Sequence, residues 1–179
     1  CVEVTNNPTI ISNSSAIVLP GVGSFGDALK NLQYYKLVDV LKKEIKRKPF
    51  LGICLGMQLL FENSSEQGLH EGLGIFKGKI IKIPSSGVKI PHMGWNQINI
   101  VKSDSKLFKS MENFINFYFV HSYYVMCKEN KIVSSTTEHG INLTASIEKD
   151  NIFAVQFHPE KSSAAGMKVL QNFLEFVNI

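Results

Sequence analysis

Residues 49–61, PFLGICLGMQLLF, set a cysteine between two glycines directly after a short apolar run. Residues 50–53 have the length and composition of a buried strand, and residues 55–63 are expected to form a helix. Gly52 and Gly56 flank Cys54 at the junction, where side chains would block a sharp turn or the approach of a substrate. This stretch predicts a strand–turn–helix unit with the Cys54 thiol at its turn.

The segments before this unit repeat its pattern. Residues 15–20, SAIVLP, form another short apolar run, which ends at Pro20 and Gly21. Between the two runs, apolar residues at helical spacing predict one helix that ends before Pro49: Leu29, Leu32, Leu37, Val40, Leu41 and Ile45. Strands that alternate with helices through short turns are typical of a parallel sheet.

The rest of the chain is predicted to be rich in strands and to end in a helix. Six segments alternate in polarity or carry β-branched and aromatic residues: 79–84, 97–103, 116–126, 131–137, 142–150 and 151–160. A terminal helix, with Ser162 or Ser163 as N-cap, is predicted from the apolar stripe Met167, Leu170, Phe173, Leu174 and Val177. We therefore expect an α/β fold: a three-layer sandwich with a mostly parallel central sheet and a β-rich edge.

Composition narrows the class of protein. The chain has 179 residues, 44% of them hydrophobic, which suits one domain with a large core. No apolar run approaches about 18 residues, so we expect no membrane partner. The densest basic cluster, residues 42–48, ends a predicted helix, which favours a solvated helix end over a nucleic-acid site. Cys1, Cys54 and Cys127 follow no disulfide or metal-ligand spacing, which favours a reducing cytoplasm and predicts no metal.

The position of Cys54 suggests a nucleophile. At a strand-to-helix junction the first helical N–H groups lack partners, and together with the helix dipole they stabilise a thiolate. The N–H of Leu55 could also receive an oxyanion. The alternative is a buried structural cysteine, because free cysteines are among the most buried residues.

A thiol nucleophile needs a base, and His158 is the first candidate among five histidines. If the segment before His158 is a strand, Gln156 lies on the same face, and Glu160 follows at the same parity. The carboxylate of Glu160 could then hold the imidazole tautomer that faces the thiol. His121 is the rival base, and an edge-strand histidine beside an unrelated acid is the other alternative. The spacing predicts a Cys54-His158-Glu160 triad.

The motifs GICLGMQ, PGVGSFGD and FHPEKS together resemble those of class I glutamine amidotransferase domains. PHMGWNQI (91–98) and FYFVHSYYV (117–125) extend the resemblance from about residue 16 to the end of the chain. The motifs are most similar to those of glutaminase subunits that serve histidine biosynthesis. The resemblance implies hydrolysis of L-glutamine to glutamate and ammonia without a cofactor. It also implies a heterodimer with a synthase (cyclase) subunit that receives the ammonia.

The resemblance assigns roles to individual residues. Cys54 matches the nucleophile, His158 the general acid and base, and Glu160 the residue that orients the histidine. The positions that match substrate-binding residues are Gly23, Gln58, Glu66, Ser122 and Tyr123, the last two through their backbone.

Further matches concern the oxyanion hole and the partner. PGVG (20–23) resembles the oxyanion strand of the family, whose Val22 amide would join that of Leu55; the alternative is an ordinary glycine-rich turn. Trp95, the only tryptophan, matches a position at the synthase interface, although a core residue is the alternative. Lys161 directly follows Glu160 and is expected at the same interface.

One departure and three alternatives accompany this interpretation. The family has a strand and a helix before the segment that matches residues 15–20, so the domain, residues 1–179, is expected to lack both. A paralogous subunit that feeds a sugar amidotransferase would use the same chemistry. A stand-alone γ-glutamyl hydrolase would use the same triad without a synthase. A non-catalytic binding module would usually have lost one of the three triad residues, and all three are present.

Overall fold

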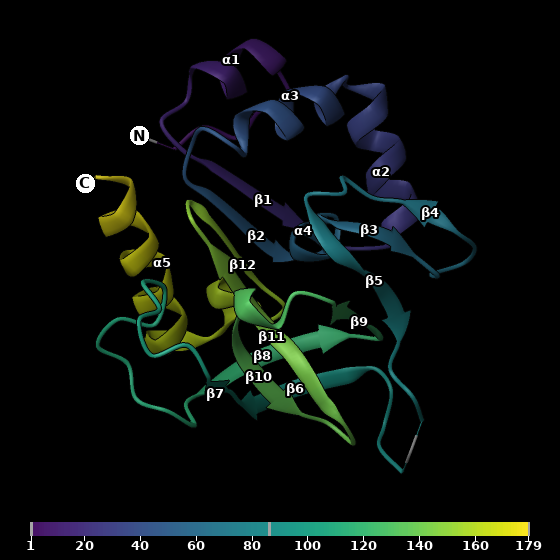
Figure 1. Cartoon of the computed structure of the whole chain (residues 1–179), viewed down its shortest axis with the longest axis vertical. Helices are drawn as coiled ribbons and strands as arrows, with labels where there is room; N and C mark the ends of the chain where they lie inside the picture. Colours follow the sequence, from purple (N-terminus) through teal and green to yellow (C-terminus); the bar gives the residue numbers. More distant parts are fainter. Residues whose placement is uncertain (1, 86, 179) are drawn as a thin grey trace.

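The computed structural model describes residues 2–85 and 87–178, which form an α/β fold around a six-stranded sheet (Figure 1). The strand order is β1-β2-β12-β11-β10-β7. Parallel pairing joins β1 (Ile17–Gly21), β2 (Phe50–Cys54) and β12 (Ile152–Val155). Antiparallel pairing adds β11 (Asn142–Lys149), β10 (Val133–Glu138) and β7 (Asn99–Ile100). The α/β class is confirmed, and the sheet is mixed, with its parallel part at the strands that carry the sequence motifs.

Two smaller sheets form the β-rich edge. The first has the order β4 (His70–Glu71), β3 (Phe61–Ser64), β5 (Phe76–Lys82) and β9 (Tyr123–Cys127). The second pairs β6 (His92–Gln97) with β8 (Asn116–His121) in antiparallel fashion. Because β8 and β9 are separated by Ser122 alone, the chain passes directly from one small sheet to the other.

Helices cover both faces of the parallel strands. The chain contains α1 (Pro8–Asn13), α2 (Phe25–Tyr34), α3 (Leu37–Glu44), α4 (Leu55–Gln58) and α5 (Ser163–Val177), with 3₁₀ turns η1 (Asn130–Ile132) and η2 (Pro159–Lys161). Figure 1 shows α1 to α3 gathered at the top of the molecule and α5 on the other side of β2.

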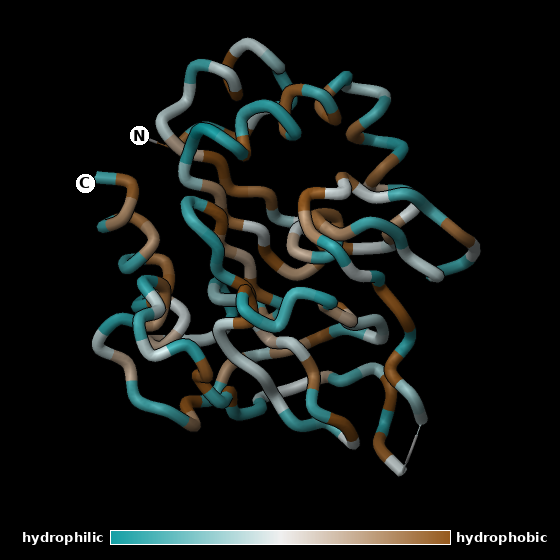
Figure 2. Tube along the Cα trace, in the orientation of Figure 1, coloured by the Kyte–Doolittle hydropathy of each residue, from teal (hydrophilic) through white to brown (hydrophobic). Residues whose placement is uncertain are grey.

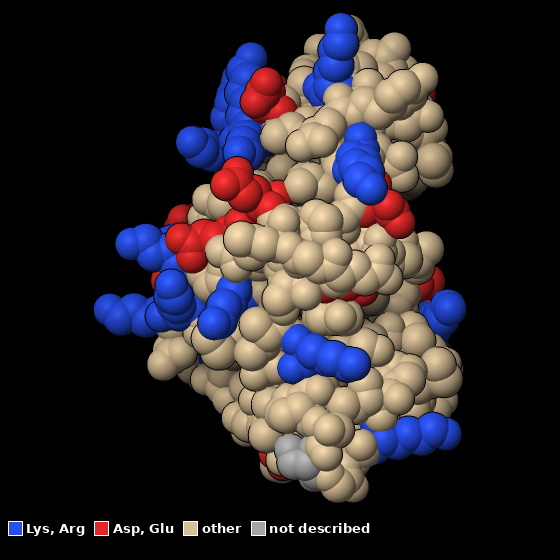
Figure 3. All heavy atoms as spheres, turned by 90° about the vertical axis from the view of Figure 1, so that its right-hand side faces the viewer, with Lys and Arg blue, Asp and Glu red and all other residues tan. Residues whose placement is uncertain are grey.

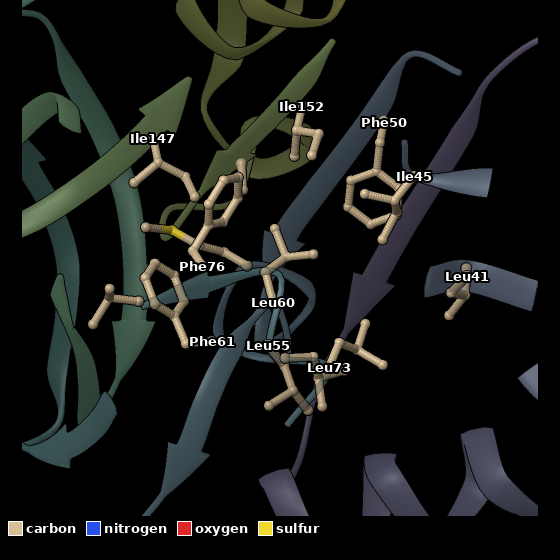
Figure 4. Close-up of a cluster of buried hydrophobic side chains, with 14 of the residues drawn as sticks. Leu41, Ile45, Phe50, Leu55, Leu60, Phe61, Leu73, Phe76, Ile147 and Ile152 are labelled. Carbon is tan, nitrogen blue, oxygen red and sulfur yellow. The ribbon is translucent and has the colours of Figure 1, made fainter. Parts of the chain in front are cut away.

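The side chains of β2 alternate between two cores, which explains the layers. Phe50 packs in a core with Leu41 and Ile45 beside α3, drawn in Figure 4. Leu51 belongs to a second core that contains Phe173 of α5. Figure 2 shows the matching pattern, with hydrophobic stretches along the central strands and hydrophilic ones at the outer turns. Burial on both faces gives the three-layer sandwich that the sequence predicts.

The structure corrects three expected elements. The helix expected between β1 and β2 is two helices, because Lys36 adopts φ 57° and breaks the run. The helix expected over residues 55–63 lasts one turn, and residues 61–64 pair with β5 instead. In α5, Met167 and Leu174 are each 53% exposed, and the buried face runs through Val169 and Phe173.

Candidate active site

Cys54 lies at a strained turn where β2 meets α4. Its backbone has φ 53° and ψ −108°, a conformation that residues other than glycine rarely adopt. A Cβ atom on Gly56 would lie 1.8 Å from the carbonyl oxygen of Leu19, and one on Gly52 would lie 2.9 Å from the carbonyl oxygen of Gly56. The two glycines are therefore required by the close approach of backbone segments, and this packing holds the turn in place.

A pocket of about 380 Å³ opens beside Cys54. Its lining contains every residue expected as nucleophile, base, oxyanion donor or substrate ligand: Val22, Gly23, Cys54, Leu55, Gln58, Glu66, Ser122, Tyr123 and His158. Pro91, Val120 and His121 complete the lining. Residues from distant parts of the sequence thus line the pocket that contains Cys54.

His158 is held by a carboxylate in the way expected of a base. Its Nδ1 lies 2.6 Å from Oε1 of Glu160, and a carboxylate oxygen accepts, so the proton is on Nδ1. His158 is 3% exposed, and its buried Nε2 has no hydrogen-bond partner among the described residues. Its backbone N–H donates to the carbonyl of Tyr118, and its carbonyl accepts from Ser162 Oγ. These contacts leave Nε2 unprotonated and free of other partners among the described residues, as a base requires.

The rival base, His121, has both ring nitrogens engaged. Nδ1 lies 2.9 Å from the carbonyl oxygen of Tyr123, and Nε2 lies 3.0 Å from Nδ1 of His92. Burial lowers the pKa of His121 to about 4. The geometry therefore favours His158 over His121 as the base.

The thiol of Cys54 differs from the expectation of a stabilised thiolate. Burial raises the pKa of Cys54 to about 11 and outweighs the lowering effect of the Leu55 backbone N–H. Helix α4 has only four residues, so it offers little of the dipole that the sequence suggested. The expectation is wrong for this structure: the sulfur is protonated at neutral pH and needs a base.

The expected substrate ligands Gln58 and Glu66 also hold the protein together. Gln58 Nε2 donates to the carbonyl of Tyr123 and to Gln156 Oε1, at 3.0 and 2.9 Å. Gln156 Nε2 in turn lies 3.6 Å from the Cys54 sulfur. Sequence reasoning assigned no role to Gln156, although its shared parity with His158 was a usable signal. Glu66 Oε2 accepts from the backbone N–H of Phe25 at 2.8 Å, at the first turn of α2.

The last two residues of the PGVG segment, Val22 and Gly23, line an exposed wall of the pocket. Val22 is 80% exposed, whereas Leu55 is 3% exposed. Gly23 adopts φ +91°, and a Cβ atom there would meet nothing within 4 Å. The positive φ explains the glycine, because the surrounding space would accept a side chain.

The two residues expected at a partner interface, Trp95 and Lys161, both lie near the ring of Tyr118. Trp95 is 54% exposed, so it is not a core residue, and its ring lies 6.2 Å from that of Tyr118. Lys161 Nζ lies 5.9 Å from the same Tyr118 ring. Met93, two residues before Trp95 on β6, is 62% exposed. Exposed apolar residues thus lie beside a cation on the outer face of β6 and β8.

Further observations bear on metals, membranes and disulfides. Within residues 2–85 and 87–178, no helix is long and apolar enough to cross a bilayer. The same described residues contain no group of three or more His, Cys, Asp or Glu that could hold a metal ion. Cys54 and Cys127 are free thiols, and Cys1 lies outside the described residues. On the face shown in Figure 3, lysine and arginine side chains stand among acidic and uncharged residues without forming one continuous patch.

Comparison with known proteins gives the family. The family model of class I glutamine amidotransferases matches residues 2–176. The chain belongs to this family. The amidotransferase chain is 50% identical over 173 residues to "Imidazole glycerol phosphate synthase subunit HisH" of Aquifex aeolicus, which covers 96% of the chain and 83% of that relative. The protein of the same name in Moorella thermoacetica is 47% identical over 177 residues, covering 98% and 83%.

Solved structures show the same fold at low sequence identity. A glutamine amidotransferase crystal structure superposes with a TM-score of 0.73 at 15% identity, covering 98% of the amidotransferase chain and 85% of the other. The glutaminase domain of Trypanosoma brucei CTPS gives a TM-score of 0.62 at 16% identity, covering 94% and 74%. A glutamine amidotransferase from Thermotoga maritima gives 0.59 at 19% identity, covering 92% and 64%.

Proposed function

We propose that this chain is the glutaminase subunit of an imidazole glycerol phosphate synthase. It hydrolyses L-glutamine to glutamate and ammonia, and the ammonia passes to a cyclase subunit that makes imidazole glycerol phosphate and AICAR in histidine biosynthesis. Family membership and relatives at 50% and 47% identity support this assignment over a sugar amidotransferase partner. Residues 1–179 act as one amidotransferase domain in this proposal, and the cytoplasm remains the expected location.

One observation carries the chemistry. His158 Nδ1 lies 2.6 Å from the Glu160 carboxylate, and its buried Nε2 has no partner in the described part of the chain, while both His158 and Cys54 line the same pocket. This arrangement supports a Cys-His-Glu triad.

The first half of the reaction begins with proton transfer. His158 Nε2 takes the proton of the Cys54 thiol. Without a base the thiol keeps this proton at neutral pH, because its pKa is about 11. The thiolate attacks the carboxamide carbon of glutamine, and the Glu160 carboxylate stabilises the imidazolium that forms. Both residues are buried and line the same pocket, which supports a direct proton transfer between them.

The second half releases the products. The carbonyl oxygen becomes an oxyanion, which the N–H of Leu55 and that of Val22 receive. His158 then gives its proton to the departing nitrogen, and ammonia leaves a thioester on Cys54. Water, activated by His158 in the same way, hydrolyses the thioester to glutamate. Gly23, Gln58, Glu66 and the backbone of Ser122 and Tyr123 hold the amino-acid end of the substrate.

The partner surface lies on the outer face of β6 and β8. Trp95 and Lys161, which flank Tyr118, contact the cyclase subunit in this proposal. The backbone of Tyr118 bonds the catalytic His158, so the partner docks one residue away from the acid and base.

The decisive experiment is Cys54→Ala, with Cys127→Ala as its matched control. Cys54→Ala is expected to abolish glutamate release from glutamine, while ammonia-dependent synthesis by the complex with the cyclase subunit continues. Cys127→Ala should keep both activities, and the glutamine analogue 6-diazo-5-oxo-norleucine should add one label at Cys54. Glutamate release by Cys54→Ala, or a label at Cys127, would overturn the triad.

A second measurement tests the pathway. The chain is expected to co-purify with a cyclase subunit from its own source and to support formation of imidazole glycerol phosphate from glutamine. Co-purification with a glycan enzyme would favour the sugar amidotransferase alternative, and full activity alone would favour a stand-alone hydrolase.

A further inference from the structure

Two buried histidines lie directly opposite each other beside the pocket. His92 of β6 and His121 of β8 are Cα partners in the antiparallel register, and they are 3% and 7% exposed. Their rings are joined by a hydrogen bond of 3.0 Å between His92 Nδ1 and His121 Nε2. Asn96 Nδ2 reaches His92 Nε2 at 3.0 Å, and His121 Nδ1 reaches the carbonyl oxygen of Tyr123 at 2.9 Å. Four residues thus form one continuous chain of hydrogen bonds.

The groups at the two ends of this hydrogen-bond chain determine which ring nitrogen of each histidine carries the proton. The Tyr123 carbonyl can only accept, so Nδ1 of His121 carries a proton, and Nε2 of the neutral ring accepts. His92 Nδ1 must then donate, which leaves its Nε2 to accept from Asn96. The amide of Asn96 is oriented independently, because its Nδ2 donates to the carbonyl of Glu138 and its Oδ1 accepts from the Gln97 N–H.

A positive charge on either ring would break the pattern. A second proton on His92 would point Nε2–H at the Asn96 NH₂ group. A proton on His121 Nε2 would force His92 into the other tautomer, with the same collision. Burial and the neighbouring histidines agree with neutral rings, since they lower the pKa of His92 to about 3 and that of His121 to about 4.

The chain ends at the backbone of the pocket. The Tyr123 carbonyl accepts from His121 Nδ1 and from Gln58 Nε2, so two side chains on different elements hold one peptide group. Gln58 continues through Gln156 to the Cys54 sulfur. The position of the Tyr123 backbone is thus tied both to β6 and to the nucleophile.

We propose that His92 is a positioning residue for glutamine binding, acting through the tautomer of His121 on the backbone of Ser122 and Tyr123. This inference rests on the proposed function, in which that backbone holds the amino-acid end of the substrate. His92 is not among the residues that line the pocket, whereas His121 is, so His92 acts on the site through its hydrogen bond to His121. Its effect falls on affinity for glutamine, since neither Cys54 nor His158 bonds to His92.

A merely structural role for His92 makes a different prediction. Its ring stacks on Phe119, with centroids 4.6 Å apart, and on His139, at 4.1 Å. If stacking were the whole role, His92→Phe would preserve it. If the hydrogen bond to His121 is required, His92→Phe lowers the affinity for glutamine. His92→Gln restores that affinity, because its amide can donate to His121 and accept from Asn96.

The first test measures glutamate release against glutamine concentration. His92→Phe is expected to raise KM about 10-fold with kcat little changed, because one buried acceptor on His121 loses its donor. His92→Gln should recover most of the affinity. His139→Phe is the matched control, because it keeps the stacking on His92 and position 139 is not part of the hydrogen-bonded series from Asn96 to Tyr123. The KM of this variant should be unchanged. Equal KM values in His92→Phe and the unchanged chain would overturn the proposal, as would a loss confined to kcat.

The second test does not depend on activity. Imidazole ¹⁵N resonances of the unchanged chain should show both His92 and His121 protonated at Nδ1 and bare at Nε2 from pH 6 to pH 8. An Nε2–H tautomer at His121 would overturn the inference even if His92→Phe fails to fold. Absence of glutaminase activity in the unchanged chain with its cyclase partner would instead refute the proposed function and leave the tautomer result standing.

Discussion

The two walls of the pocket are built differently. On one wall, Cys54, Leu55 and His158 are 7%, 3% and 3% exposed; Cys54 ends β2, Leu55 begins α4, and His158 follows β12 as the N-cap of η2. On the other wall, Val22 is 80% exposed and Gly23 faces open space. Side-chain hydrogen bonds occur just after that wall, between Ser24 and Asp27 and from the Phe25 N–H to Glu66.

Because of this difference, the proposed catalytic side chains and the segment expected to respond to a partner lie on different walls of the pocket. Cys54 and His158, the proposed nucleophile and base, are held by a close-packed turn and by backbone hydrogen bonds, so we expect their geometry not to depend on a partner. Val22, the proposed oxyanion donor, lies on a segment with few packing constraints. A change in activity on partner docking is therefore expected to come from the Val22 wall, while the Cys54 wall stays as it is.

The largest expected effect comes from removing His158, the proposed base in the buried wall. His158→Ala should lower the rate of glutamate release by about 10²–10⁴-fold, because general acid–base transfer contributes that much. Glu160→Gln should lose less, since it disturbs the orientation of the imidazole and leaves the base in place. Steady-state assays with saturating cyclase subunit measure both. A greater loss in Glu160→Gln than in His158→Ala would contradict these roles.

The second prediction concerns the protonation of Cys54. With a pKa of about 11, Cys54 has at pH 7.5 a thiolate fraction roughly 10²–10³-fold below that of an unperturbed thiol, whose pKa is about 8.5. Alkylation of Cys54 by iodoacetamide should therefore rise about tenfold for each pH unit between 7 and 10, and level off above about 11. Peptide mapping by mass spectrometry separates Cys54 from Cys127. An inflection near pH 7 would show a thiolate at rest.

Two glycine substitutions compare the walls directly. Gly23→Ala should fold normally but lower kcat about 10-fold, because alanine disfavours the φ of +91° that this segment requires. Gly56→Ala should instead lower the free energy of unfolding by about 3 kcal/mol or more, since its Cβ would overlap the Leu19 carbonyl. Urea unfolding and glutamate release distinguish the outcomes. Similar stability losses in both variants would remove the contrast.

The smallest effect is expected at the partner surface. Trp95→Ala should leave the labelling of Cys54 by 6-diazo-5-oxo-norleucine unchanged, because Trp95 lies outside the pocket lining. It should reduce, by a few fold, the stimulation of glutamate release by the cyclase subunit. Met93→Ala is a control for apolar area on the same strand. Slower labelling in Trp95→Ala would show that the outer face also shapes the resting site.

Much of this architecture could be predicted from local patterns. The apolar run before Cys54, the glycines around it and the His-x-Glu spacing each act within a few residues, so the sequence expresses them directly. The break at Lys36 could not be predicted, because the apolar spacing continues across it and only the backbone shows the left-handed residue. The short α4 was missed because an apolar run such as LLF suits a helix or a strand equally.

The remaining differences arise from contacts between distant segments. The pairing of His92 with His121 depends on the register of β6 against β8, which composition does not encode. The protonated state of Cys54 depends on how deeply β2 is covered, and the local sequence suggested the opposite. Gln156 could have been noticed from its parity, but its bonds to Gln58 and Cys54 require the fold.

Tyr118 connects the proposed partner surface to the proposed base by different parts of the same residue. Its main chain holds the loop of His158, the proposed base, through its carbonyl to the His158 N–H and its N–H to Ser162 Oγ. Its ring alone faces Trp95 and Lys161. Main-chain bonds survive most side-chain replacements, so residue 118 can vary to suit a new docking surface while the loop keeps its place. If the proposed function holds, recognition at this position is expected to change independently of turnover.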